Sequence, residues 1–396
     1  MNIIIFSKHF YPENFKINHI ANYFSKNHNV TVITGNNTHT DRKKYFSKFK
    51  KYKYKNVEVY SFPVFVKKKN NFINIFFDYF FYCLLLSLNI IKLKNFRCDI
   101  IFTYGTSPIF QAIPAILLAK LLRVPSLLWV QDLWPEVLVD TGYIKNKSIL
   151  TIINFFVKKI YLLTDIILAQ SKSFQTHLIK NYNLKHLSVV HQPADFLFQR
   201  YNLKKNKNFI ITYAGNFGLA QDFETILNAF KSGLISQNIQ LQLIGSGKKY
   251  NYISDFIVKN KLSNIKIIDH MSEVKIQKFL YNSDAFFISL KSGDSLNKTL
   301  PGKFQTYISF GKPILSVSPG YISKFIIKNK IGLSSLPGDI KKLTLNIDKL
   351  SKLSFFEKKN IYRRCKKLYF LYFDIHKVST QILSIMNKAD VKKNLL

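Results

Sequence analysis

The window WVQDLWPEVLVDTG places one amide and two carboxylates directly after an apolar run. Gln131 and Asp132 follow SLLWV, and Glu136 comes shortly after them. An apolar run that ends in polar groups is typical of a strand that delivers side chains to a ligand site at a sheet edge. We therefore expect Asp132 or Glu136 to contact a polar substrate. An Asp helix cap packed beside two tryptophans is the alternative explanation.

Two glycine turns have the character of phosphate sites. YAGNFGLAQ places Gly215, Asn216 and Gly218 between an apolar run and a helical pattern, and IGSG places Gly245 and Gly247 after the next apolar run. Glycine allows backbone amides and a helix N-terminus to approach a diphosphate closely. Neither turn has the full G-x-G-x-x-G spacing, so ordinary strand-to-helix turns explain both patterns as well.

A Pro-Gly turn in TLPGKFQTYISFGKPIL precedes Lys303 at an expected helix start. Gln305 and Thr306 follow in the first turns of that helix. The positive end of a helix dipole and a lysine together favour an anion. A solvated surface lysine is the alternative, because lysine is abundant throughout this chain.

The order of elements predicts two α/β domains that would position these groups. Apolar runs alternate with helical spacing from NIIIFS onward, and the alternation restarts at FIITYAG after a lysine-rich segment at 198–208. We predict two doubly wound, Rossmann-like domains, at 1–197 and 208–354, followed by a helical tail at 355–396. Ligands of such sheets bind beyond the carboxyl ends of the strands.

Composition excludes several classes of protein. The 396 residues are 47% hydrophobic and 20% charged, which argues against disorder. The net charge is +37, but only six of the 59 basic residues are arginine. Base readout and bidentate phosphate clamps favour arginine, so we expect no nucleic acid partner. Three cysteines without metal-ligand or disulfide spacing fit a reducing cytoplasm.

Residues 72–91, FINIFFDYFFYCLLLSLNII, are the one membrane-like stretch. Asp78 and Asn89 interrupt it, so a long core helix is the favoured interpretation. A helix lying on a membrane surface is the second, since a basic tract and Lys67–Lys69 precede it. A transmembrane span is the third. The N-terminus has no apolar secretion signal.

We predict that the protein needs neither a metal nor a cofactor. No D-x-D-like carboxylate pair is placed to hold a cation, and no Cys/His cluster has metal spacing. The chain also lacks a GxxxxGK[ST] loop and a G-x-S-x-G elbow, so P-loop and hydrolase chemistry have no support.

Taken in order along the chain, the motifs resemble the family-4 retaining glycosyltransferases. HFYPENFKINHIANYF, TYGTSPIF, VQDLWPEVLVDTG, YAGNFGLAQDFETIL, IGSGKKY and LPGKFQTYISFGKPIL carry the likeness over nearly the whole chain. QDLWPE combined with PGK-x-Q-[ST]-Y resembles the subgroup of L-fucosamine (N-acetyl-L-fucosaminyl) transferases of O-antigen and capsule assembly. The resemblance implies the GT-B architecture, with the nucleotide sugar on the second domain, the acceptor on the first, and the tail crossing back to the first.

The family's functional positions carry over unevenly. The family has an arginine and a lysine that contact the diphosphate, and Asn216 and Gln221 stand at those positions here. Lys298 and Thr306 stand where the family has two glutamates. The resemblance then implies that Lys303 meets the diphosphate beside Gly215, Asn216 and Gly218. Four residues are expected at the ribose and base: Gln305, Thr306, His270 and Gly245. Four are expected on the acceptor or donor-sugar side: Glu13 and Asn14, which replace a glycine loop, Gln131 and Glu136.

The resemblance implies an enzyme that transfers a sugar from a nucleotide diphosphate donor to a lipid-linked saccharide at the cytoplasmic face of the membrane. The anomeric configuration of the sugar is expected to be retained. UDP is the expected carrier. Lys303 is the expected stabiliser of the leaving group, and Asp132 is expected to orient sugar hydroxyls. A UDP-sugar 2-epimerase of the same fold and a non-catalytic membrane-surface scaffold are the alternatives.

Overall fold

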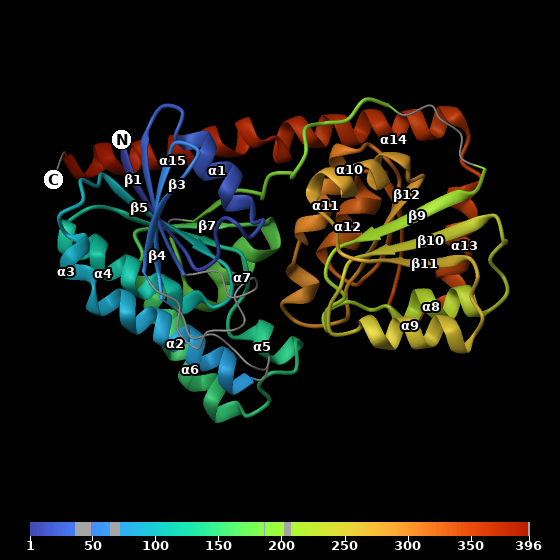
Figure 1. Cartoon of the computed structure of the whole chain (residues 1–396), viewed down its shortest axis with the longest axis horizontal. Coiled ribbons are helices and arrows are strands. Elements are labelled where there is room, and N and C mark those ends of the chain that lie inside the picture. Colours follow the sequence, from blue (N-terminus) through green and yellow to red (C-terminus); the bar gives the residue numbers. More distant parts are fainter. Residues whose placement is uncertain (36–48, 64–71, 186, 202–206, 395–396) are drawn as a thin grey trace. The chain divides into compact units, whose positions relative to one another are not determined.

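The computed structural model describes residues 1–35, 49–63, 72–185, 187–201 and 207–394. The chain divides into two compact units (Figure 1), one of residues 1–192 and 375–396 and the other of residues 193–374. The expected boundaries were 197 and 208, and residues 202–206 of the expected linker lie outside the described residues.

Unit 1 is built on an eight-stranded sheet in the order β3-β4-β2-β1-β5-β6-β7-β8. Its neighbouring strands are parallel, apart from the antiparallel pair β3–β4. The strands are β1 (Asn2–Ser7), β2 (Asn29–Gly35), β3 (Lys50–Tyr54), β4 (Val57–Phe62), β5 (Ile100–Gly105), β6 (Ser126–Val130), β7 (Ile166–Ala169) and β8 (Leu187–Val189).

Helices cover both faces of this sheet. The helices are α1 (Lys16–Phe24), α2 (Phe72–Leu88), α3 (Ile90–Leu93), α4 (Ala112–Leu122), α5 (Glu136–Asp140), α6 (Lys147–Leu163), α7 (Lys172–Tyr182) and α15 (Ile375–Asn394). Burial on both faces explains the continuous apolar run of β1. Ile3 and Ile5 pack into one core, and Ile4 and Phe6 pack into another.

Unit 2 has a six-stranded, wholly parallel sheet in the order β11-β10-β9-β12-β13-β14. Its strands are β9 (Phe209–Ala214), β10 (Ile239–Ile244), β11 (Ile265–Ile268), β12 (Ala285–Ser289), β13 (Ile314–Val317) and β14 (Gly332–Ser335). Its helices are α8 (Glu224–Lys231), α9 (Tyr250–Lys259), α10 (Glu273–Asn282), α11 (Gly302–Ser309), α12 (Tyr321–Lys328), α13 (Ile340–Ser351) and α14 (Phe355–Leu368). The strand order reverses between β9 and β12, which is the usual position of a ligand in such sheets.

The C-terminal tail is divided between the units. Helix α14 contributes Ile361 and Cys365 to a core of unit 2. Helix α15 contributes Val378, Ile382 and Met386 to a core of unit 1. The two segments meet at Asp374, which follows a π-helical turn at Tyr369–Phe373.

The prediction of two Rossmann-like parallel sheets is confirmed. The stretch at 72–91 forms α2 and α3, with Tyr82 and Leu86 buried and Leu84 and Leu88 exposed. Over the residues that the structure describes, no helix has the length and apolarity needed to cross a membrane. Lys67–Lys69 and the side chain of Asp78 lie outside the described residues.

Candidate functional site

Both glycine turns lie at the carboxyl end of the unit 2 sheet and touch each other. Gly215 follows β9 and Gly245 follows β10, with φ angles of +141° and +145°. A Cβ on Gly245 would overlap the Gly215 carbonyl oxygen, and one on Gly247 would overlap the Asn216 side chain. Glycine is therefore required here for the close approach of the two loops.

Three amides of the first loop donate hydrogen bonds inside the protein. Gly215 N donates to the Ile244 carbonyl at 2.9 Å, and Phe217 N donates to the Ser246 carbonyl at 2.7 Å. Gly218 N donates to Gln221 Oε1 at 2.9 Å. These bonds hold the loop rigidly. The sequence led us to expect that these amides face a diphosphate. Instead, the amides of Gly215, Phe217 and Gly218 are bonded within the protein.

Lys303 is the cationic group beside this loop. It lies in the first turn of α11, whose N-cap Pro301 offers no side-chain cap to the first amides. A Cβ built on Gly215 would come within 3.3 Å of Lys303 Nζ. The loop and the lysine thus form one cradle, in which the positive end of α11 adds to the lysine charge.

Burial lowers the pKa of Lys303 to about 7. Its ammonium lies over the Tyr213 ring, 3.7 Å from the centroid, and hydrogen-bonds the Tyr213 hydroxyl. No carboxylate of the described residues pairs with it. An ammonium removed from water without a counter-charge is strongly stabilised by an incoming anion.

The other residues expected at the nucleotide have different surroundings. Gln305 is fully buried, and its amide nitrogen donates to the carbonyls of Pro301 and Gly302. Its contact with ribose therefore has no geometric support. Thr306 is also buried, and its hydroxyl donates to the carboxylate of Asp195. His270 is exposed and follows β11, which pairs with β10, the strand that precedes Gly245.

Three residues that shape this site were missed at the level of sequence. Tyr213 supports Lys303, and its hydroxyl donates to the Asn216 carbonyl at 2.7 Å. Tyr307 stacks on Phe286 and accepts a hydrogen bond from Ala214 N at 2.8 Å. Asp195 brings a carboxylate to Thr306 from a distant part of the chain. Tyr213 and Tyr307 lie in apolar runs that read as core, and no local pattern marks Asp195.

In unit 1, Asp132 follows β6 and is held in a fixed orientation. Its Oδ2 accepts hydrogen bonds from Ser107 N and Ser107 Oγ, both at 2.8 Å. Ser107 Oγ in turn accepts from Trp134 Nε1 at 3.0 Å. Burial raises the pKa of Asp132, and the two bonds from Ser107 oppose that rise. Among the described residues, Ser107 alone hydrogen-bonds this carboxylate.

Gln131 and Glu136 flank Asp132 in separate networks. Gln131 Oε1 accepts from Gln192 Nε2, whereas the buried Gln131 Nε2 has no partner in the described part of the chain. Glu136 Oε1 lies 2.9 Å from His177 Nε2 on α7. Glu136 therefore joins α5 to α7 through this contact.

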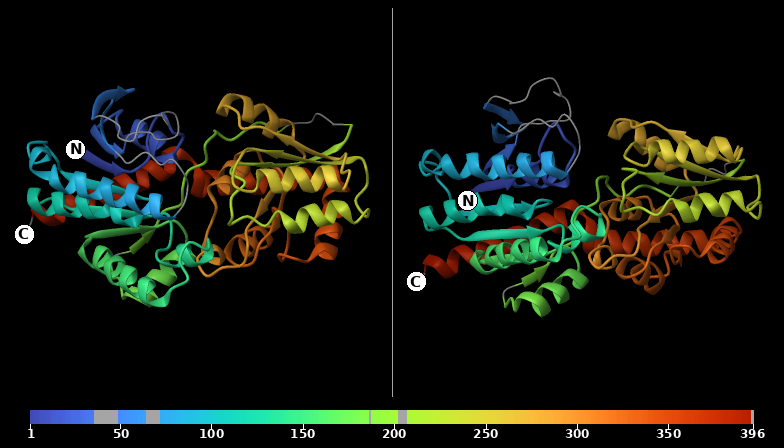
Figure 2. Two further views of the ribbon diagram at one scale, coloured as in Figure 1. Left: turned by 60° about the horizontal axis from the view of Figure 1, so that its bottom comes forward. Right: turned by 90° about the horizontal axis from the view of Figure 1, so that it is seen from below.

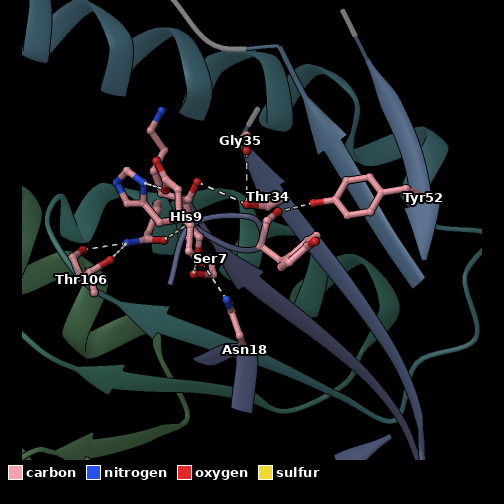
Figure 3. Close-up of polar contacts among 11 residues, drawn as sticks. Ser7, His9, Asn18, Thr34, Gly35, Tyr52 and Thr106 are labelled. Carbon is pink, nitrogen blue, oxygen red and sulfur yellow. Dashed lines mark hydrogen bonds and ion pairs between the residues drawn. The ribbon is translucent and has the colours of Figure 1, made fainter. Parts of the chain in front are cut away.

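The loop after β1 holds Glu13 and Asn14. Glu13 Oε2 lies 2.7 Å from His9 Nδ1, and the His9 ring stacks on Phe15. The Glu13 carbonyl accepts from Asn18 Nδ2 at 2.7 Å, and Asn14 is exposed. Figure 3 shows Ser7 and Thr34 beside this loop, where they donate to the carbonyls of His9 and Lys8. Gln111 links the loop to Thr106, because it accepts from Lys8 N and donates to the Thr106 carbonyl. These residues lie at the carboxyl edge of the sheet, as do Gln131 and Asp132.

Family comparisons agree with this architecture. Residues 17–196 match the model "Glycosyltransferase Family 4", and residues 195–367 match "Glycosyl transferases group 1". The chain is a glycosyltransferase. An uncharacterized glycosyltransferase of Methanocaldococcus jannaschii is 23% identical over 305 residues, which is 76% of this chain and 78% of the relative.

Solved structures of other proteins share the GT-B fold of this chain. Sucrose-phosphate synthase of Thermosynechococcus elongatus has a TM-score of 0.74 at 12% identity, with 98% of each chain covered. HepE of Anabaena, in complex with UDP and glucose, has a TM-score of 0.69 at 12% identity, covering 98% of this chain and all of HepE (100%). A glycosyltransferase of Rickettsia africae has a TM-score of 0.68 at 15% identity, with 98% of each chain covered.

Proposed function

We propose that this glycosyltransferase moves a sugar, with retention of anomeric configuration and without a metal ion, from a UDP-sugar to a lipid-linked saccharide. The reaction takes place at the cytoplasmic face of the membrane during assembly of a surface polysaccharide such as O-antigen or capsule. N-acetyl-L-fucosamine or a related amino or deoxy sugar is the transferred group, because the QDLWPE and PGKFQTY motifs resemble those of the L-fucosamine transferases.

The observation that carries the donor half of the proposal is the environment of Lys303. Its ammonium is desolvated, it has no carboxylate partner among the described residues, and it lies against the loop of Gly215. A nucleoside diphosphate would supply the missing negative charge. Likeness to HepE, whose solved complexes contain UDP or UDP-glucose, supports uridine diphosphate as the carrier.

Departure of the diphosphate is the step that Lys303 would accelerate. As the bond from the anomeric carbon to the phosphate oxygen breaks, negative charge accumulates on the leaving oxygen. Lys303 and the N-terminus of α11 are fixed in place before this charge develops, so little reorganisation is needed. The acceptor hydroxyl attacks from the face that the phosphate leaves, and the leaving phosphate oxygen takes its proton.

Asp132 would orient sugar hydroxyls in this reaction. Ser107 occupies its Oδ2 and fixes the plane of the carboxylate. Its other oxygen is then available to accept a hydrogen bond from a hydroxyl of donor or acceptor. Orientation of this kind lowers a barrier by holding the reacting atoms in line, without any proton transfer by the carboxylate.

A transfer assay tests the proposal. The protein is incubated with UDP-N-acetyl-amino sugars and a polyprenyl-diphosphate saccharide in detergent, and the release of UDP and the glycosylated lipid are measured. We expect UDP release that depends on the acceptor, persists in EDTA and yields a linkage of the donor's anomeric configuration. Conversion of the UDP-sugar to its 2-epimer without acceptor would instead favour an epimerase, and an inverted linkage would contradict the retaining mechanism.

A further inference from the structure

Helix α6 carries apolar side chains on two opposite faces. Val157, Ile160 and Tyr161 are buried against unit 1. The side of the helix that points away from the core bears six large apolar side chains: Ile149, Ile152, Phe155, Phe156, Leu162 and Leu163. A surface helix of a water-soluble domain normally places polar groups on this side. The outward face of α6 therefore requires a separate explanation from the core.

The exposure of these side chains is substantial. Ile152 and Phe155 retain 59% and 57% of their accessible surface, and the rings of Phe155 and Phe156 pack edge to face at 5.6 Å. Single exposed apolar residues are common on proteins, but a contiguous apolar patch marks a contact surface. We call these six side chains the α6 face.

The apolar surface continues over the neighbouring helices. Helix α4 packs against both α2 and α6, and α3 packs against α4 (Figure 2 shows α2 in light blue beside α4 in teal). Leu117 and Leu121 of α4 are exposed, as are Leu84 and Leu88 of α2. Helices α2 and α4 thus share the outward apolar character of α6.

The charged groups on these helices are basic, with the exception of Asp78 on α2. Helices α3, α4 and α6 contain no Asp or Glu, and the single acid of α2 is Asp78. Lys158 and Lys159 are exposed, and Lys159 Nζ lies 5.6 Å from the centre of the Phe155 ring. A lysine whose stem runs along an aromatic ring keeps its charge at the water boundary while the ring enters an apolar phase.

A cavity of about 810 Å³ borders the end of this surface. Leu163 of the α6 face is one of its walls, and Lys120, Arg123, Lys185 and Lys388 contribute cationic side chains. Asp165, which also lines it, accepts hydrogen bonds from Ser126 N and Ser126 Oγ at 2.8 Å. The lining suits a phosphate group next to an apolar surface.

We infer that the α6 face, continued by α4 and α2, docks on the surface of an anionic lipid bilayer. The apolar side chains enter the interface between headgroups and acyl chains, and the lysines contact the lipid phosphates. The inference rests on the proposed function only in that a lipid-linked acceptor requires a nearby membrane. It differs from a role of residues 72–91 alone, because six of the exposed apolar side chains lie on α6.

A lipid surface fits this face better than a second copy of the chain. Two copies meeting through the same face would bring Lys158 and Lys159 of each toward the other with no acid on α3, α4 or α6 to pair with them. The net charge of +37 adds to this repulsion. An anionic bilayer supplies both the apolar phase and the compensating charge.

Vesicle flotation with the full-length chain tests the inference. The vesicles contain equal parts of phosphatidylglycerol and phosphatidylcholine, with pure phosphatidylcholine for comparison. We expect the wild type to float with the anionic vesicles. The triple variant Ile152→Ser, Phe155→Ser, Phe156→Ser should bind them at least about tenfold more weakly, because burial of these groups in the interface is lost. Inorganic phosphate should not release the wild type, which distinguishes a bilayer from a free phosphate ligand.

The matched control replaces exposed apolar residues of unit 2, as Leu234→Ser, Val258→Ser, Ile327→Ser. Each of these side chains is at least 57% exposed, but they are not grouped on one helix, so the control should float like the wild type. Lys158→Glu with Lys159→Glu should weaken binding to anionic vesicles by about fivefold or more for each lysine and leave the thermal unfolding temperature unchanged.

Two results would overturn the inference. One is equal flotation of the wild type and the α6 variant, with both proteins folded by circular dichroism. The other is a wild-type dimer that the α6 substitutions convert to a monomer, with no change in vesicle binding. Binding of UDP to the same preparations separates this test from that of the proposed function, since UDP binding can persist when flotation fails and can fail when flotation persists.

Discussion

Lys303 and Lys312 lie at opposite ends of one short segment of unit 2, yet their surroundings differ. Burial lowers the pKa of both, to about 7 and about 8. Lys312 Nζ donates to the carbonyls of Leu280, Tyr281 and Ser283, and so completes the end of α10. Lys303 Nζ instead lies over the Tyr213 ring and donates a hydrogen bond to the Tyr213 hydroxyl.

The difference separates a structural lysine from a ligand-binding one. A buried ammonium with several carbonyl acceptors is already satisfied and stabilises the fold. A buried ammonium facing a phenol ring and a glycine loop is under-satisfied, which lowers stability but prepares the site for an anion. Neighbouring lysines with similar burial can therefore be assigned different roles from the atoms that face each ammonium.

The largest effect is expected on turnover. Lys303→Ala should reduce kcat by about two to three orders of magnitude, because one charge contact to the leaving diphosphate is lost. Lys312→Ala should leave kcat within about threefold of the wild type, since the structure gives it no contact with the Gly215 loop. Initial rates of UDP release at saturating donor provide the measurement. Equal losses in both variants would remove the distinction.

The free energy of unfolding should depend more on Lys312 than on Lys303. Lys312→Met leaves carbonyls at the end of α10 without a donor and should lower the free energy of unfolding by about 1–3 kcal/mol. Lys303→Met removes a desolvated cation and should leave that free energy unchanged or raised. Urea denaturation followed by circular dichroism checks both. A larger destabilisation by Lys303→Met would show that Lys303 has a structural role.

The sequence predicts much of this arrangement but not the contrast between the two lysines. Alternating apolar and helical runs predict both sheets, and the Pro-Gly turn places Lys303 at a helix start. Tyr213 sits beneath Lys303 because β9 and α11 are adjacent in space, a relation between residues far apart in the chain. The inward turn of the Gly215 and Phe217 amides also depends on contact with the end of β10 and the loop that follows it. No local pattern encodes either feature.

The exposed face of α6 is likewise invisible in the sequence. IINFFVKKIYLL has the apolar content of a core helix, and only the fold shows which side chains face away from the core. The division of the tail at Asp374 is a matter of tertiary packing too, because α14 and α15 pack on different cores.

The pH dependence of UDP binding should reveal the titration of Lys303. Above pH 7 its ammonium is largely deprotonated in the free protein, so binding of the diphosphate must take up a proton. Affinity should then fall by up to about tenfold per pH unit between roughly pH 7.5 and 9, where the phosphate itself is fully ionised because its second pKa is about 6. Isothermal titration calorimetry in buffers of different ionisation enthalpy measures the proton uptake. Lys303→Ala should show none, and a wild type without uptake would argue against a lowered pKa.

The lowered pKa of Lys303 also determines how the free energy of unfolding of the unliganded protein changes with pH. The unfolded chain keeps the Lys303 proton up to about pH 10.5, whereas the folded chain releases it near pH 7. Stability should therefore rise with pH across this window as far as Lys303 contributes, because the unfolded state binds more protons there. The rise should be smaller in Lys303→Met than in the wild type when both are unfolded by urea at pH 7 and pH 9.

The smallest effect is expected from the support beneath Lys303. Tyr213→Phe keeps the ring under the ammonium but removes the hydroxyl that contacts Lys303 Nζ and donates to the Asn216 carbonyl. UDP affinity should fall by about threefold to tenfold, the usual range for one hydrogen bond. Calorimetric titration at pH 7 provides the value, with Tyr307→Phe as a comparison on the neighbouring helix. An unchanged affinity would mean that the ring alone positions Lys303.

The most direct test of the central claim is a titration of UDP against the wild type, Lys303→Ala and Lys312→Ala, followed by thermal unfolding. Ligand binding to the native state must raise stability, by about 2.7 kcal/mol at a ligand concentration one hundred times Kd. We predict that UDP raises the Tm of the wild type and of Lys312→Ala, more than GDP or TDP does, and that Lys303→Ala loses most of this rise. An undiminished response to UDP in folded Lys303→Ala, or no response to any nucleotide in the folded wild type, would contradict the account.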